Sequence, residues 1–147
     1  MNKYVEWYKE YQKRIDEFPM KFAFTQEALE RGMKELGLEP HETNKIRSIG
    51  CGGFIRATDV EAFKQLFNGR ANELRERMKD DDFMYEALVY ELANHEYGYT
   101  GDSDDALYSL GLLPEQVNND TMDPAWVIGL GWSHAMFINV LEKLYAK

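Results

Sequence analysis

The chain has 147 residues, a formal net charge of −9 at pH 7, one cysteine and an aromatic content of 14%. Its length suits one domain, residues 1–147, with a real core, and a lone cysteine excludes an intrachain disulfide. No run approaches the roughly 20 apolar residues of a membrane span, and the charged N-terminus lacks the apolar centre of a signal peptide. These features predict a cytoplasmic protein.

The charge is distributed unevenly along the chain. Residues 1–79 carry 15 Lys and Arg against 13 Asp and Glu, whereas residues 80–147 carry 2 against 13. No Lys or Arg occurs between Asp80 and Glu142. A field of one sign repels nucleic acid and attracts basic partners. Alternatively, the basic residues of the first half neutralise the acids of the second.

Apolar periodicity predicts a helix and a strand at the start of the chain. A stripe at helical spacing predicts a helix over residues 3–18, ended by Pro19; it comprises Tyr4, Tyr8, Tyr11, Ile15 and Phe18. In residues 20–24, Met20, Phe22 and Phe24 alternate with other residues, which indicates a short strand with one apolar face.

The next segments predict a helix, a hairpin and a second helix. Thr25 is a plausible N-cap for a helix through Leu36, and Gly37 ends it. Residues 46–56 fit a hairpin whose turn is Gly50–Gly53, and at least one of these glycines is expected to have a positive φ. An apolar stripe that stays in phase across Asn68-Gly69 predicts one helix to about Lys79. Its basic residues, Arg70 among them, are expected on the solvent side.

The segment Asp82–Gly98 is apolar around most of a helical wheel, which predicts a central helix with Gly98 as its C-cap. The preceding Asp80-Asp81-Asp82 supplies its N-cap and negative charge in its first turn. Glu91 and His95 are four residues apart and share a face. A short helix through Leu107 follows, and Asp123-Pro124 begins a last helix to about Tyr145. His95 and His134 lie on apolar stripes and are expected to be buried. The fold class is therefore α+β: a mostly helical single domain of five to six helices with a small antiparallel sheet of two or three short strands.

Three segments of the chain resemble an uncharacterised family of small bacterial and phage proteins. They read FAFTQEALERGMKELGL, KIRSIGCGGFIRATDVEAF and ELANHEYGYTGDSDDALYSLGL. The resemblance covers roughly residues 18–113 and leaves out the helix after Asp123. It brings no activity and no catalytic residues, and it implies a phage or mobile-element setting.

Few residue combinations point to chemistry. Cys51 and His95, with Glu91 or Asn94, are the residue types of a thiol nucleophile, a base and an orienting group, but no signature of a thiol enzyme flanks Cys51. Glu91, His95 and His134 form an incomplete metal-ligand set without an HExxH pattern. The glycine turn matches no phosphate or dinucleotide loop. We therefore expect no catalytic residue, no metal and no cofactor.

The favoured function is that of a small acidic binding or regulatory protein, non-enzymatic, which acts through an acidic aromatic surface on a host protein. The alternative is a small-ligand-binding, sequestering protein or an enzyme, with a site around Glu91, His95 and the Gly50–Gly53 turn. The candidate binding residues are Glu91, His95, Glu96, Tyr97, Tyr99, Asp102, Asp104 and Asp105.

The expected partner is a protein with a basic surface or a small molecule, with no nucleic acid and no membrane, and the sequence is compatible with a homo-oligomer. A closed pocket that reaches His95 would favour the alternative, and a convex acidic face alone would favour the first function.

Overall fold

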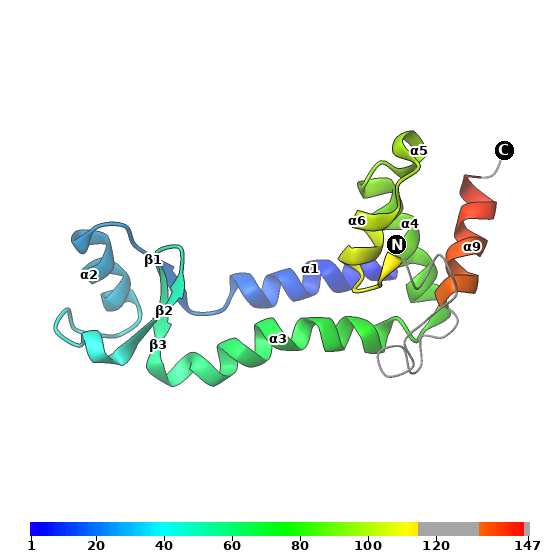
Figure 1. Ribbon diagram of the computed structural model, residues 1–147. Helices are drawn as coiled ribbons and strands as arrows, with labels where there is room; N and C mark the ends of the chain where they lie inside the picture. The colour runs from blue at the N-terminus through cyan, green and yellow to red at the C-terminus, as the bar shows by residue number, and fades with distance from the viewer. Residues whose placement is uncertain (115–132, 146–147) are drawn as a thin grey trace. The chain divides into compact units, whose positions relative to one another are not determined.

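Figure 1 shows a computed structural model of the protein, which describes residues 1–114 and 133–145. The described residues form seven α-helices, two short 3-10 helices and a three-stranded antiparallel sheet. This is the mostly helical α+β fold that the sequence predicts. Contacts divide the chain into two compact units, one of Met1–Tyr11 with Arg70–Lys147 and one of Gln12–Gly69. Folding of residues 1–147 as a single domain stays a prediction.

The unit of residues 12–69 is built on the sheet. Its strands are β1 (Met20–Phe22), β2 (Ile46–Gly50) and β3 (Gly53–Arg56), and β3 lies between the other two. The hairpin of β2 and β3 therefore gains β1 as the third strand that its stability requires. The 3-10 helices Thr43–Lys45 and Ala57–Asp59 flank this hairpin.

Helix α2 (Gln26–Glu35) packs on the sheet of the same unit (Figure 1). The Thr25 hydroxyl caps it by accepting a 3.1 Å hydrogen bond from the Ala28 N–H, as the sequence predicts. At its other end, Gly37 has a φ of +80° and the Leu38 N–H donates to the Met33 carbonyl at 2.9 Å. This is the predicted glycine C-cap. The small core beneath comprises Met33, Leu36 and Phe54.

The glycine turn has positive φ values, as predicted. Its aromatic neighbours Phe22 and Phe24 are exposed. Gly50, Cys51 and Gly52 have φ values of +90°, +51° and +78°. The predicted strand is present as β1, and the Phe22 and Phe24 side chains on its predicted apolar face are 57% and 84% exposed. Their rings lie against the turn: a Cβ on Gly52 would meet the Phe24 ring at 2.7 Å, and one on Gly53 would meet the Phe22 ring at 2.8 Å.

Glycine suits this turn for two reasons, a positive φ and a close approach of neighbouring atoms. Alanine at Gly50 and at Gly52 distinguishes these reasons. Both substitutions place a side chain at positive φ, and we expect each to lower the free energy of unfolding by about 1 kcal/mol. Alanine at Gly52 is expected to cost more, because its Cβ also meets the Phe24 ring and the Ala23 carbonyl, whereas open space surrounds Gly50. Urea unfolding of the two variants checks this order, and an unchanged midpoint in both would contradict a strained turn.

The other unit gathers around α4 (Asp81–Asn94), which contacts α5 (Tyr97–Thr100), α6 (Asp104–Ser109) and α9 (Ser133–Leu144) (Figure 1). The prediction of a central helix is confirmed. Its buried apolar residues are Phe83, Met84, Ala87, Leu88 and Leu92.

Two long helices contribute to both units. Helix α1 spans Lys3–Asp16, and helix α3 spans Val60–Arg77 without a break at Asn68-Gly69. The buried residues of α1 are Tyr4, Trp7 and Tyr11, while Tyr8 is 41% exposed. Tyr4 and Tyr11 are therefore buried as the stripe predicts, and Trp7 takes the buried position that the stripe gives to Tyr8. No helix in the described part of the chain is long and apolar enough to cross a membrane.

The predicted end of the central helix is wrong. Helix α4 ends at Asn94 with His95 as its C-cap, and the left-handed residue is Glu96, with a φ of +57°. Gly98 lies inside the one-turn helix α5, and Gly101, with a φ of +68°, follows it.

Asp80 begins α4 as predicted, and its side chain accepts a 3.0 Å hydrogen bond from the Phe83 N–H. This hydrogen bond lowers the pKa of the Asp80 carboxyl. Because the folded-state pKa lies below the unfolded value, the cap stabilises above the unfolded pKa and is lost as pH falls through the folded one. We expect Asp80→Ala to lower the melting temperature at pH 7 and to have little effect at pH 2. Asp80→Asn, which keeps the acceptor, is the control, and an equal loss at both pH values would contradict this role.

Several predictions concern residues outside the described part of the chain. The start of the last helix at Asp123-Pro124 lies there, and so does the side chain of His134. The described portion of that helix, α9, buries Phe137 and Val140.

Candidate functional site

The centre of the candidate site is a buried carboxylate, Glu91, which is 4% exposed. Its Oε1 accepts a 2.8 Å hydrogen bond from the Tyr4 hydroxyl, and its Oε2 lies 3.2 Å from His95 Nε2. Burial raises the pKa of Tyr4 well above its usual range, and the hydrogen bond to Glu91 raises it further. Tyr4 is therefore a fixed donor at neutral pH, and both Glu91 oxygens are engaged.

His95 connects this carboxylate to α6. Its Nε2 lies 3.1 Å from Ser109 Oγ, and the Ser109 hydroxyl donates to the Asp105 carbonyl at 2.9 Å. Because the serine proton points at that carbonyl, Nε2 must carry the hydrogen toward both Glu91 and Ser109. The Nδ1 atom then has no partner among the described residues. The His95 side chain is 30% exposed, so it is less buried than predicted, because it caps α4 at the rim of a cavity.

This cavity, called here the His95 cavity, has a volume of about 310 Å³, and every residue that lines it belongs to one unit. Its volume lies at the lower end of the range for small-molecule sites. It is lined by Tyr4, Tyr8, Arg70, Glu91, Asn94, His95 and Ser109.

The most unusual lining group is the Arg70 guanidinium, which has no carboxylate partner among the described residues. It lies over aromatic rings of α1, with Cζ 5.0 Å from the Trp7 ring centre and 5.5 Å from that of Tyr8. Cation–π contacts hold an arginine without using its hydrogen-bond donors. The five N–H donors of Arg70 are therefore available to a bound molecule.

The arrangement of Ser109, His95 and Glu91 does not form a nucleophile triad. In a triad one imidazole nitrogen takes the serine proton while the other is held by the carboxylate. Here Nε2 contacts both Ser109 and Glu91, and the serine proton is directed at a backbone carbonyl. The geometry suits binding better than acyl transfer.

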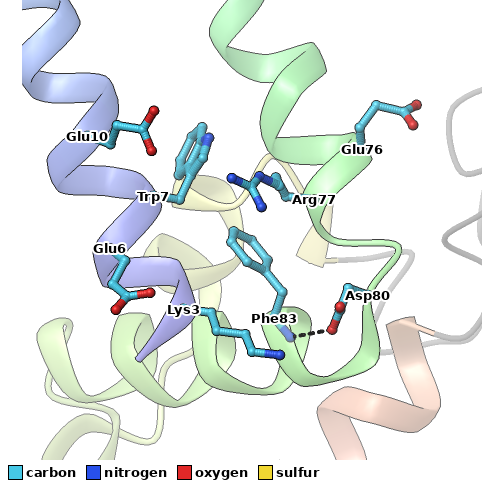
Figure 2. A pocket seen from close by; sticks show the side chains of 8 residues that line it. All are labelled: Lys3, Glu6, Trp7, Glu10, Glu76, Arg77, Asp80 and Phe83. Carbon is cyan, nitrogen blue, oxygen red and sulfur yellow. Dashed lines mark hydrogen bonds between the residues drawn. The ribbon is translucent and has the colours of Figure 1, made fainter. Parts of the chain in front are cut away.

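A second cavity, of about 380 Å³, lies among α1, the end of α3 and the start of α4 within the same unit (Figure 2). Figure 2 shows the rings of Trp7 and Phe83 in it, with Arg77 directed toward them. Most of its charged side chains already have a partner within the protein: Asp80 caps α4, and Lys3 Nζ lies 3.6 Å from Asp82. We therefore place the candidate site at the His95 cavity.

The predicted site residues separate into two groups. Glu91 and His95 line the cavity, whereas Glu96, Tyr99, Asp102, Asp104 and Asp105 are exposed on α5, α6 and the turns before them. Tyr99 is 95% exposed, but Tyr97 is half-buried, its ring 4.8 Å from that of Tyr145. Tyr97 and Asp102 do not line the cavity.

The Gly50–Gly53 turn, which the alternative function placed beside Glu91 and His95, belongs to the other unit. Cys51 lies at its tip, with an exposed side chain in the left-handed region.

Sequence reasoning missed Tyr4, Tyr8, Arg70 and Ser109 as members of the site. Arg70 was assigned to the solvent side of its helix, and the two tyrosines were assigned to one apolar stripe. Of the lining residues besides Glu91 and His95, only Asn94 could be placed near the site from the sequence, because it directly precedes His95.

The fold and site define a mostly helical α+β protein with a small polar cavity. Its sequence matches the model of a family of unknown function, DUF7659, over residues 3–123, and the chain belongs to that family. The match extends beyond the roughly 18–113 that the sequence motifs indicated. No curated protein and no solved structure matches the chain.

Proposed function

We propose that this protein binds a small polar molecule in the His95 cavity and acts by holding it, without catalysis. The observation that carries this proposal is the set of lining groups whose hydrogen-bonding capacity is unused. Within the described residues, the side chains of Arg70, Tyr8 and Asn94 and the His95 Nδ1 atom have no hydrogen-bond partner; Arg70 and His95 are half-buried, whereas Tyr8 and Asn94 are exposed to solvent. Polar groups held in a cavity favour a ligand that satisfies them.

A binding role also agrees with the rigidity of the site. Tyr4 and Ser109 have their protons fixed, and His95 is held from two sides. A site arranged in advance loses less conformational entropy when a ligand enters. The cavity reaches His95 but is open, so it is not the closed pocket named above as the sign of a ligand-binding function; its opening lets a ligand enter and leave without local unfolding.

Closing the cavity tests this function. Ser109 is exposed at the rim, so Ser109→Leu is expected to fill part of the cavity, whereas Ser109→Ala removes the hydroxyl and leaves the space. Equilibrium dialysis against deproteinised cell extract, read by mass spectrometry, is expected to enrich a molecule on the wild type and on the alanine variant. Loss of enrichment only in the leucine variant supports the proposal. Enrichment that survives in the leucine variant, or none on the wild type, contradicts it.

A second candidate function is the binding of a basic host protein through an acidic segment, defined here as residues 96–105. Its four carboxylates, Glu96, Asp102, Asp104 and Asp105, have no cationic partner within 4 Å among the described residues. Tyr99, almost fully exposed, lies among them. Exposed aromatic residues commonly carry binding energy at interfaces. This second proposal includes a phage or mobile-element origin for the protein.

Charge removal tests the acidic segment. Asp102 accepts a 2.9 Å hydrogen bond from the Asp104 N–H, which asparagine can also accept, so a triple Asp→Asn change at 102, 104 and 105 should keep the fold. A protein captured from lysate by the wild type at low salt, but not by the triple variant, supports this function. Capture that is equal for both and independent of salt contradicts it.

A further inference from the structure

We propose that the molecule held in the His95 cavity is a small organic anion, a carboxylate or a phosphate ester, whose charged group binds the Arg70 guanidinium. This inference rests on the proposed function and names the class of its ligand.

The Arg70 side chain is held in place but has no partner for its charge within the described part of the chain. Its side chain is half-buried, its charge has no counter-ion among the described residues, and its guanidinium is held over the rings of Trp7, Tyr8 and Tyr11 at 5.0, 5.5 and 6.0 Å. Such contacts fix the plane of the guanidinium while leaving its N–H groups free. A fixed guanidinium fork matches the two oxygens of a carboxylate or phosphate.

Among the described residues, the one acid in the cavity lining already has a partner for each of its carboxylate oxygens. Glu91 has both oxygens engaged, one by Tyr4 and the other by His95. A cationic ligand would have to compete with these two donors for a buried carboxylate. An anionic ligand finds Arg70 without a competitor.

The neutral polar groups at the rim suit an organic anion. Tyr8 and Asn94 both offer donors to an oxyanion and acceptors to other polar atoms of the same molecule. The Tyr8 ring, which is partly exposed, adds apolar surface. Together these groups suit an organic anion with a body, in preference to a bare inorganic ion.

Three isosteric probes of different charge test the inference: benzoate, benzamide and benzamidine. Titration of each into ¹⁵N-labelled protein, followed by NMR, reports weak binding and the residues involved. We expect benzoate to bind about tenfold more tightly than benzamide, the gain of one charge-assisted pair, and benzamidine to bind least. Phenyl phosphate is the fourth probe, and whichever of the two anions binds more tightly identifies the acid group.

Variants assign the effect to Arg70. Arg70→Gln is expected to remove the tenfold preference for benzoate, while Arg77→Gln, a cation on the same helix that lines the other cavity, should keep it. Because loss of the ring contacts of Arg70 can disturb the fold, Asn94→Asp provides an independent test from α4. It places a negative charge at the rim and should weaken benzoate several-fold more than it weakens benzamide.

The outcomes separate the inference from the proposed function. Equal affinity for benzoate and benzamide, or a preference for benzamidine, overturns the anionic class and leaves a binding cavity. A benzoate preference that persists in Arg70→Gln also overturns it. If no probe binds and dialysis enriches no molecule, the proposed function itself fails.

Discussion

Trp7→Ala is expected to produce the largest loss of stability of any change considered, about 3–5 kcal/mol in the free energy of unfolding. Trp7 is 2% exposed, and its ring lies 5.5 Å from that of Tyr11 and 6.3 Å from that of Phe83, with Arg70 over its face. Alanine removes all of these contacts and leaves a void that the surrounding rings cannot fill. Urea unfolding followed by circular dichroism measures the loss.

Tyr8 provides the matched control for Trp7, since it is the next aromatic residue of α1 and is 41% exposed. Tyr8→Ala should cost much less. Equal losses in the two variants would show that the buried face of α1 has been assigned to the wrong residues.

Glu91→Ala is expected to cost about 2–3 kcal/mol, because it leaves the buried Tyr4 hydroxyl without an acceptor. Tyr4 is 1% exposed, so water cannot replace the lost partner without a change in packing. Glu91→Gln keeps an acceptor of the same shape and should cost less than half as much. The measurement is again the free energy of unfolding from urea denaturation.

The comparison of alanine and glutamine at Glu91 distinguishes a hydrogen-bonding role from simple filling of space. If both variants lose the same stability, the Tyr4–Glu91 hydrogen bond contributes nothing beyond volume. Tyr4→Phe offers a check from the other partner, since it removes the donor and keeps the ring.

Local signals predicted the elements of this fold well. The Thr25 N-cap, the Gly37 C-cap, the Asp80 cap and the strained glycine turn each depend on a few neighbouring residues, and each is confirmed. The central helix was also identified, because a helix that is apolar around most of its circumference must be covered on several sides.

Predictions that depend on tertiary contacts were less accurate. The alternation of Phe22 and Phe24 indicates a shared face but not which face the rest of the chain covers, and both rings proved exposed. At Gly98, a glycine signal was overridden by an earlier stop in which Glu96 takes the left-handed conformation. Neither choice is encoded within a few residues.

The site shows the same division. The Glu91–His95 pair follows from helical spacing, and the structure confirms that the two side chains meet. The other lining residues Tyr4, Arg70 and Ser109 come from three other helices, separated from Glu91 by up to 87 residues. Spacing along one helix cannot identify such partners, so Arg70 looked like an ordinary surface cation.

The most direct test of ligand binding at the His95 cavity is an NMR footprint of ¹⁵N-labelled protein in deproteinised cell extract. We predict that amide signals of Asn94, His95 and Ser109 shift, while those of the Gly50–Gly53 turn do not. The Ser109→Leu variant should show no such shifts. Signals that move only in the acidic segment, or none that move at all, would contradict binding in this cavity.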